Sequence, residues 1–236
     1  MIKFIGVGSA FNTRFGNTSG FIQGRESLLL IDCGSSVFHR LMEADLLDGL
    51  KDLRVIITHT HPDHVGSLGD LVFYAHHILK IKPRVYFPES SLVHAILELM
   101  GVEDHMYDLV GTMEAEEPGA GGGGFRLAFV PVSHMPNIPS FGFYLERGGR
   151  RIFYSGDSNR LVAGVLDQLR KGDLDMIYQD TCGLDYPDNV HLSLKRLCQE
   201  VPPELRGRVC CSHHDRSLDL DQVREAGFQV AEVWKG

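Results

Sequence analysis

A hydrophobic run leads directly into a cluster of metal-binding side chains in the stretch LRVIITHTHPDH, residues 53–64. The β-branched residues 55–57 predict a buried strand. Side chains two positions apart on a strand share a face, so His59 and His61 are expected to project together from this strand. The stretch therefore predicts a strand that presents two imidazoles to a common site.

Pro62 ends regular strand pairing and begins a turn. The turn brings Asp63 and His64 beside the two histidines, so four potential ligands lie within six positions. A His-rich tract can also be a weak, adventitious metal binder. Imidazole and carboxylate are, however, the ligand types that suit Zn²⁺ and similar divalent ions, and here they follow a strand instead of a polar repeat. We interpret the cluster as part of a metal site.

Length and composition bound the fold and the partners. The chain has 236 residues, 43% of them hydrophobic, which is enough for one α/β domain with a sizeable core. Its formal net charge is -8, and its pI is about 5.8. An acidic chain argues against binding long nucleic acid along an extended basic surface, whereas a small anion held by a metal remains compatible.

The cysteines and the hydropathy pattern indicate a cytoplasmic protein. An odd number of cysteines without CxxC spacing favours a reducing compartment. The amino-terminal sequence has no signal-peptide pattern, and no apolar run approaches membrane-spanning length, so no membrane partner is expected. The five cysteines are Cys33, Cys182, Cys198, Cys210 and Cys211.

The remaining pattern predicts alternating strands, helices and one long loop. Strands are expected at residues 2–7, 19–23 and 27–31, and helices at 36–50, 66–79 and 90–100. The second of these helices would begin just past His64 and direct its positive N-terminal end toward the metal site. The Glu- and Gly-rich segment 114–124 is expected to be a loop. Asp32 is interpreted as a turn residue or a carboxylate that supports a ligand, and Cys33 as a small buried side chain.

Three further strands end in side chains of the ligand type. Strands expected at residues 125–132 and 151–157 lead to His134 and Asp157, and a third leads to His213 and His214. Strand ends that each present such residues point to one site at a sheet edge. The sequence leaves open whether His213 or His214 is the ligand.

The pattern His59-x-His61-x-Asp63-His64, followed by these separated residues, resembles the ligand set of the metallo-β-lactamase fold superfamily. The resemblance implies a single-domain αββα sandwich of two mixed sheets flanked by helices, with two divalent ions, Zn²⁺ first and Mn²⁺ as the alternative. In that family, the residues that match His59, His61 and His134 bind one metal. Those that match Asp63, His64 and His213 bind the other, and the counterpart of Asp157 bridges the two.

Within the superfamily, the chain looks most like the tRNase Z branch of phosphodiesterases. The motifs that carry this resemblance are Gly6-x-Gly8-Ser9-Ala10, Leu30-Ile31-Asp32-Cys33-Gly34 and, after His134, Ser140-Phe141-Gly142-Phe143. The family pairs a carboxylate with a histidine that is not a ligand, as a proton donor. Here, His191 matches the histidine, and Asp180 stands where the family has Glu, one methylene longer.

The chain lacks a long basic segment like the arm with which tRNase Z grips tRNA. It looks similar instead to phage-type anti-Pycsar cyclic nucleotide phosphodiesterases, on Ser9-Ala10-Phe11-Asn12 and Asn189-Val190-His191-Leu192-Ser193. The resemblance implies hydrolysis of a cyclic mononucleotide to a mononucleotide, immune evasion against cyclic nucleotide signalling and a homodimer, in which a partner-subunit loop could complete the pocket. We expect a two-metal hydroxide as the nucleophile, Asp63 to orient or deprotonate it, and His191, positioned by Asp180, as the general acid.

Alternatives remain open at this level. A tRNase Z-like endoribonuclease, or another RNA or DNA phosphodiesterase, could share the ligands. A thioesterase or glyoxalase-like hydrolase could use the same metals on a different ester. A metal-binding scaffold would hold the ions without hydrolysis.

Overall fold

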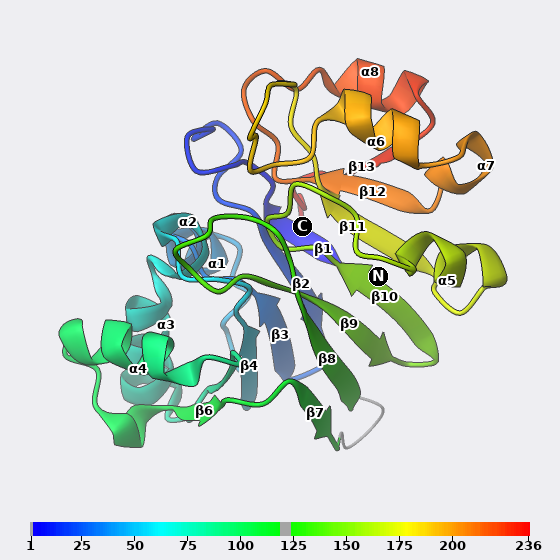
Figure 1. Cartoon of the computed structure of the whole chain (residues 1–236). Helices are drawn as coiled ribbons and strands as arrows, with labels where there is room; N and C mark the ends of the chain where they lie inside the picture. Colours follow the sequence, from blue (N-terminus) through cyan, green and yellow to red (C-terminus); the bar gives the residue numbers. More distant parts are fainter. Residues whose placement is uncertain (1, 119–123) are drawn as a thin grey trace. The chain divides into compact units, whose positions relative to one another are not determined.

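The chain folds into two compact units in the computed structural model, which describes residues 2–118 and 124–236 (Figure 1). One unit comprises Met1–Met113 together with Glu232–Gly236, and the other comprises Glu114–Ala231. Each unit contains one mixed sheet and its own helices. The expectation of a single domain stays a prediction.

The sheet of the first unit changes from antiparallel to parallel pairing at its third strand. Its order is β1-β2-β3-β4-β5-β6; the first three strands pair antiparallel and the rest parallel. The hairpin β2–β3 was predicted with its observed bounds. The strands are β1 (Lys3–Gly6), β2 (Ser19–Gln23), β3 (Ser27–Ile31), β4 (Asp52–Ile56), β5 (Arg84–Tyr86) and β6 (Asp108–Val110).

The helices of the first unit are shorter than the sequence pattern predicted. The predicted helix 36–50 ends at Glu43, because Asp45 and Gly49 adopt left-handed φ angles of 53° and 67°. The predicted helix 66–79 is divided between α3 and a π-helical segment. The helices are α1 (Val37–Glu43), α2 (Pro62–Val65), α3 (Leu68–Tyr74), the π-helix Ala75–Leu79, α4 (Ser90–Leu99) and the 3₁₀ turn Asp104–Met106.

The second unit repeats the change from antiparallel to parallel pairing. Its sheet has the order β13-β12-β11-β10-β9-β8-β7, antiparallel from β7 to β10 and parallel from β10 to β13. The strands are β7 (Glu114–Glu117), β8 (Phe125–Pro131), β9 (Phe141–Arg147), β10 (Arg150–Tyr154), β11 (Met176–Asp180), β12 (Val209–Ser212) and β13 (Gln229–Val230). The helices are α5 (Val165–Lys171), α6 (Leu194–Glu200), α7 (Pro203–Arg206) and α8 (Leu220–Glu225).

The core of the second unit lies between its parallel strands and these helices. Phe153, Ile177 and Val209 occupy one row across the register and are fully buried. They belong to the same hydrophobic cluster as Leu169 of α5 and Leu197 of α6. The helices α5 and α6 can be found by their labels in Figure 1. Burial of each such side chain stabilises the folded state by about 1.5–3 kcal/mol.

The prediction of a loop over residues 114–124 is wrong for its first part. Glu114–Glu117 forms the edge strand β7, in which Glu114 faces Ala128 and Glu117 faces Phe125. Charged residues are typical of edge strands, where they discourage pairing with another chain, and tertiary pairing outweighs their low strand propensity. Residues 119–123, which the predicted loop also covers, lie outside the described residues.

The parallel strands of each sheet place the segments that follow them at one edge. In the first unit, β3 and β4 run side by side, so Asp32 and the segment from Thr58 onward emerge together. In the second unit, β9 pairs antiparallel with both β8 and β10. Strand β8 therefore runs in the same direction as β10, β11 and β12. The carboxyl ends of such strands are where α/β sheets bind ligands. No helix among the described residues is long and apolar enough to cross a membrane.

Arg206 joins the ends of two helices in the second unit. Its guanidinium donates to the carbonyl oxygens of Cys198 (2.6 Å), Val201 (3.0 Å) and Ala226 (3.0 Å), and it lies over the ring of Phe228. Val201 and Ala226 are the C-terminal capping residues of α6 and α8, where a cation is favourable.

We predict that Arg206→Ala lowers the free energy of unfolding by about 3 kcal/mol, because three charge-assisted hydrogen bonds are lost together. Urea denaturation measures the change. The control is Arg170→Ala on α5, which removes an exposed ion pair with Asp167 and should leave the midpoint nearly unchanged. Equal losses in the two variants would contradict a special role for Arg206.

Candidate metal centre

In the first unit, the carboxylate of Asp32 is fully buried and orients His64 directly and His59 through Thr58. Oδ1 accepts from the backbone N–H of Thr58 (2.8 Å), and Oδ2 accepts from the Thr58 hydroxyl (2.9 Å) and from Nδ1 of His64 (2.9 Å). Burial raises the pKa of Asp32, while the charge of His64 and the hydrogen bonds from His64 and Thr58 act in the opposite direction. Asp32 thus orients His64, a candidate ligand.

These hydrogen bonds fix the tautomers of His59 and His64. The Thr58 hydroxyl gives its proton to Asp32, so it can accept from Nδ1 of His59, 3.1 Å away. The Nδ1–H of His64 points at Asp32. In both rings, Nε2 therefore carries the lone pair that a metal requires.

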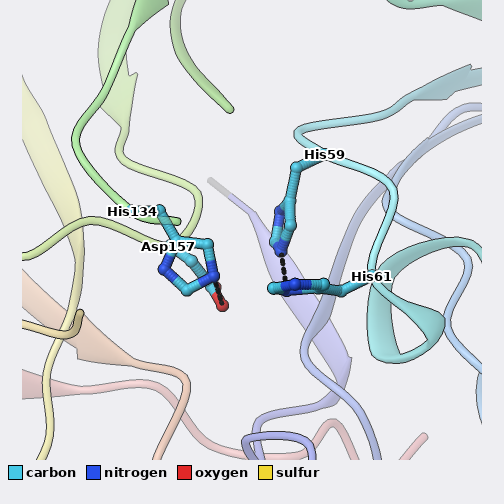
Figure 2. Close-up of side chains that lie close together, drawn as sticks. All are labelled: His59, His61, His134 and Asp157. Atoms are coloured by element: carbon cyan, nitrogen blue, oxygen red, sulfur yellow. Dashed lines mark hydrogen bonds and ion pairs between the residues drawn. The ribbon is translucent and has the colours of Figure 1, made fainter. Parts of the chain in front are cut away.

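His59 and His61 face each other through their ring nitrogens. Nε2 of His59 lies 3.0 Å from Nδ1 of His61, the dashed contact in Figure 2. Two nitrogens on one tetrahedral Zn²⁺ lie about 3.3 Å apart, given Zn–N bonds of about 2.0–2.1 Å. The pair therefore fits a shared ion. The expectation that both lie on a strand is wrong: β4 ends at Ile56, and Thr58 bonds to Asp32 instead of a neighbouring strand.

Asp63 and His64 lie in the short helix α2, which begins at Pro62, where the sequence predicted a turn. The helix predicted to begin just past His64 corresponds to α3, which begins at Leu68. Nε2 of His64 is 3.4 Å from Oδ2 of Asp63. The backbone beneath them is tightly packed, because a Cβ on Gly34 would lie 1.9 Å from the carbonyl oxygen of Asp63. Only glycine fits there, so the Asp-Cys-Gly segment after β3 supports the ligand turn through its backbone.

In the second unit, His134 is oriented by the backbone. Its Nδ1–H donates to the carbonyl oxygen of Val190 (3.2 Å), which leaves Nε2 toward Oδ2 of Asp157, 3.8 Å away (Figure 2). Burial lowers the pKa of His134 despite the opposing charge of Asp157. A lowered pKa favours the neutral form of the ring, which is the form that binds a metal.

His213 approaches the other oxygen of the same carboxylate. Its Nε2 lies 3.4 Å from Oδ1 of Asp157. One oxygen of Asp157 thus faces His134 and the other faces His213, an arrangement suited to a carboxylate that bridges two ions. The neighbouring His214 is turned into the protein, where its Nε2 donates to the carbonyl oxygen of Cys211 (2.9 Å). This geometry favours His213 over His214 as the ligand.

Asp180 is the buried carboxylate of the second unit and ends strand β11. Oδ2 accepts from Nδ1 of His191 (2.7 Å) and from the backbone N–H of Ser158 (3.0 Å), and Oδ1 lies 3.4 Å from Nδ1 of His213. Burial lowers the pKa of His191, but the charge and hydrogen bond of Asp180 outweigh it, so the pKa lies above its usual value. The shorter Asp side chain therefore reaches the histidine, and His191 is held ready to carry a proton.

The donors of each unit fit divalent ions chemically. They are imidazole nitrogens and carboxylate oxygens, which suit Zn²⁺ and Mn²⁺. Among the described residues, no cysteine belongs to a cluster of potential metal ligands. Burial raises the pKa of Cys33 to about 12 and that of Cys211 to about 12, which favours the protonated thiols. Cys33 is fully buried, as predicted.

Sequence reasoning did not identify the groups that orient the ligands. Thr58 adjoins the histidine motif but carries no motif signal of its own, and the carbonyl of Val190 and the backbone N–H of Ser158 cannot be recognised from residue type. Asp180 was found only through the resemblance. Such contacts depend on the backbone path.

The comparisons with known proteins identify the family and the fold. A family model described as "Anti-Pycsar protein Apyc1" matches residues 1–234. The chain belongs to this family.

Relatives with this description include proteins from Paenibacillus harenae and Bacillus phage BSP38. The first is 29% identical, covering 98% of this chain and 96% of the relative, and the second is 28% identical, covering 92% and 90%. A "Ribonuclease Z" of Mycobacterium sp. (strain KMS) is 25% identical over 95% of this chain and 79% of the relative.

Two solved structures show the fold. The metallo-β-lactamase fold protein YhfI from Bacillus subtilis has a TM-score of 0.74 at 18% identity, covering 100% of this chain and 98% of that one. Human tRNase Z, short form, has a TM-score of 0.67 at 19% identity, covering 98% and 95%. The predicted metallo-β-lactamase fold and the predicted resemblance are both confirmed. Membership of this family also confirms the predicted metal-dependent hydrolase that acts on phosphodiesters.

We predict that Asp32→Asn weakens metal binding by about 10–100-fold, the usual effect of losing a carboxylate that orients a ligating histidine. The amide offers only one acceptor oxygen, whereas Thr58 and His64 together present three donors. Competition with a chelator measures the affinity. Asp48→Asn, at an exposed position of the same unit, is the control and should bind metal normally. Unchanged affinity in Asp32→Asn would contradict the role of Asp32.

Proposed function

We propose that the protein hydrolyses cyclic mononucleotides to mononucleotides and thereby opposes a defence that signals through cyclic nucleotides. The observation that carries the proposal is the match of residues 1–234 to the anti-Pycsar family. The acidic chain, with a net charge of -8, also suits a small anion better than a long one.

The ligand assignment is part of the proposal and rests on the family resemblance together with the geometry inside each unit. His59, His61 and His134 would hold one ion, and Asp63, His64 and His213 the other, with Asp157 shared. Zn²⁺ is the proposed metal and Mn²⁺ the alternative. Bound there, two divalent ions would lower the pKa of water and neutralise charge on the phosphoryl group.

The protein's own groups would move the protons. Asp63 would accept a proton from the attacking water as the water oxygen forms a bond to phosphorus and the bond between phosphorus and the leaving oxygen breaks. The leaving alkoxide needs a proton, and His191 supplies it from Nε2 while Asp180 holds Nδ1–H, the 2.7 Å contact. His191 is proposed as the general acid because its side chain is 25% exposed, and therefore accessible to a substrate, whereas that of Asp180 is fully buried.

A tRNase Z-like ribonuclease is the second candidate. It is favoured by the sequence similarity to the ribonuclease Z from Mycobacterium and by the fold shared with the human tRNase Z structure. A homodimer and a cytoplasmic location are further proposals carried by the resemblance and by cysteine usage. Size-exclusion chromatography with light scattering tests the dimer, and a monomer mass would refute it.

A substrate screen tests the proposed function. We predict that protein loaded with Zn²⁺ or Mn²⁺ cleaves cyclic mononucleotides faster than short oligonucleotides or precursor tRNA. His61→Ala and Asp157→Ala should abolish turnover because each loses a ligand. His39→Ala, which removes an exposed partner of Glu43, should keep it. Faster cleavage of precursor tRNA would favour the second candidate, and thioester hydrolysis alone would refute both.

The proton donor can be tested separately. We predict that His191→Ala keeps its bound metal but loses about 10²–10⁴-fold in turnover of cyclic nucleotides, whose leaving alkoxide requires protonation. Nitrophenyl phosphodiesters, with a stable leaving group, should lose much less. An equal loss on both substrates would argue against a general acid.

A further inference from the structure

Arg160 lies in the loop that carries Asp157 and is bonded to the loop that carries His134. Its Nη2 donates to the Ser133 hydroxyl, 2.9 Å away. The backbone N–H of Asn159 donates to the carbonyl oxygen of Ser133 (2.9 Å), which fixes the two loops against each other. The guanidinium is thus placed beside two of the proposed ligand segments by contacts within the second unit.

The partners of Arg160 are all neutral. Its Nε–H donates to the side-chain oxygen of Asn159 (3.3 Å), and its own carbonyl oxygen accepts from the Ser158 hydroxyl (2.8 Å). Over residues 2–118 and 124–236, no carboxylate forms an ion pair with it. Other arginines of this unit do have such partners, Arg151 with Glu146 and Arg170 with Asp167.

A positioned guanidinium without an acidic partner is suited to bind an anion. Arginine has five N–H groups, and the contacts with Asn159 and Ser133 use two of them, so three remain for a ligand. Its planar fork matches the oxygens of a phosphate. The chain as a whole carries a net charge of -8, so an anionic substrate benefits from a local positive charge near the site.

We propose that Arg160 binds the phosphodiester anion of the substrate and thereby sets its affinity. The proposal rests on the proposed function, in that the substrate is a phosphodiester, but it does not depend on which phosphodiester it is. Asn159 and Ser133 act as positioning residues that hold the guanidinium beside His134.

The test compares Arg160→Gln with Arg160→Lys and with Arg150→Gln in metal-loaded protein. Arg150 is a matched control because it is an exposed arginine at the start of β10, whereas Arg160 lies in the loop that follows the end of this strand. With bis(4-nitrophenyl) phosphate as the probe, Arg160→Gln should raise KM at least about tenfold, the value expected for losing a charge-assisted hydrogen bond. Its kcat should stay within about threefold, and bound metal and Tm should not change. Arg160→Lys should recover part of the affinity, and Arg150→Gln should behave as the unaltered protein.

Three results would overturn the proposal. An unchanged KM in Arg160→Gln would show that the guanidinium does not contact the substrate. Loss of bound metal would make Arg160 a residue that positions His134 instead. An equal rise of KM in Arg150→Gln would show a general effect of charge.

Failure of the proposed function is distinguishable from failure of this inference. If the protein cleaves the nitrophenyl probe but no cyclic mononucleotide, the proposed substrate is wrong, while the KM comparison still tests Arg160. If it cleaves neither, titration calorimetry with inorganic phosphate replaces turnover. Binding about tenfold weaker in Arg160→Gln than in Arg150→Gln would then support the inference, and equal binding would refute it.

Discussion

Asp32 and Asp180 are buried carboxylates, and a buried charge is tolerated only when hydrogen bonds replace the water it has lost. Each ends, or directly follows, a parallel strand, and each accepts a backbone N–H from a neighbouring segment. Each also contacts histidine rings, His64 for Asp32 and both His191 and His213 for Asp180. Burying these carboxylates costs free energy unless donors surround them. The histidine rings that supply such donors are thereby held in one orientation.

This constraint gives each unit a preorganised set of donors. His59 and His64 have their Nδ1 atoms committed to Thr58 and Asp32, and His134 has its Nδ1 committed to a backbone carbonyl. The folded chain alone therefore sets the orientation and tautomer of these rings, and binding of an ion would not have to reorder them. Preorganisation of this kind lowers the entropic cost of binding and favours one geometry over others.

Local patterns in the sequence predicted most strands well, because strand pairing in a hairpin depends on residues close in the chain. The hairpin β2–β3 is an example. The metal-ligand assignment of the cluster His59–His64 stays a prediction. The predicted placement of His59 and His61 on a strand was wrong because Asp32, distant in sequence, takes the N–H of Thr58 and ends the pairing. Likewise, β7 forms only because β8 is available as a partner. The position of Arg160 could not be predicted, since its contact with Ser133 joins loops that are 27 residues apart.

Charge offers a physical reason why a small substrate suits this chain. A polynucleotide brings one negative charge per phosphate, and an acidic surface repels each one that lies outside the site. A cyclic mononucleotide brings a single charge, which the proposed metal ions and the guanidinium of Arg160 would neutralise. A net charge of -8 thus disfavours long substrates without a dedicated basic arm, while a short anion needs only local compensation. On this argument, selectivity depends on the contrast between the positive charge inside the site and the negative charge around it.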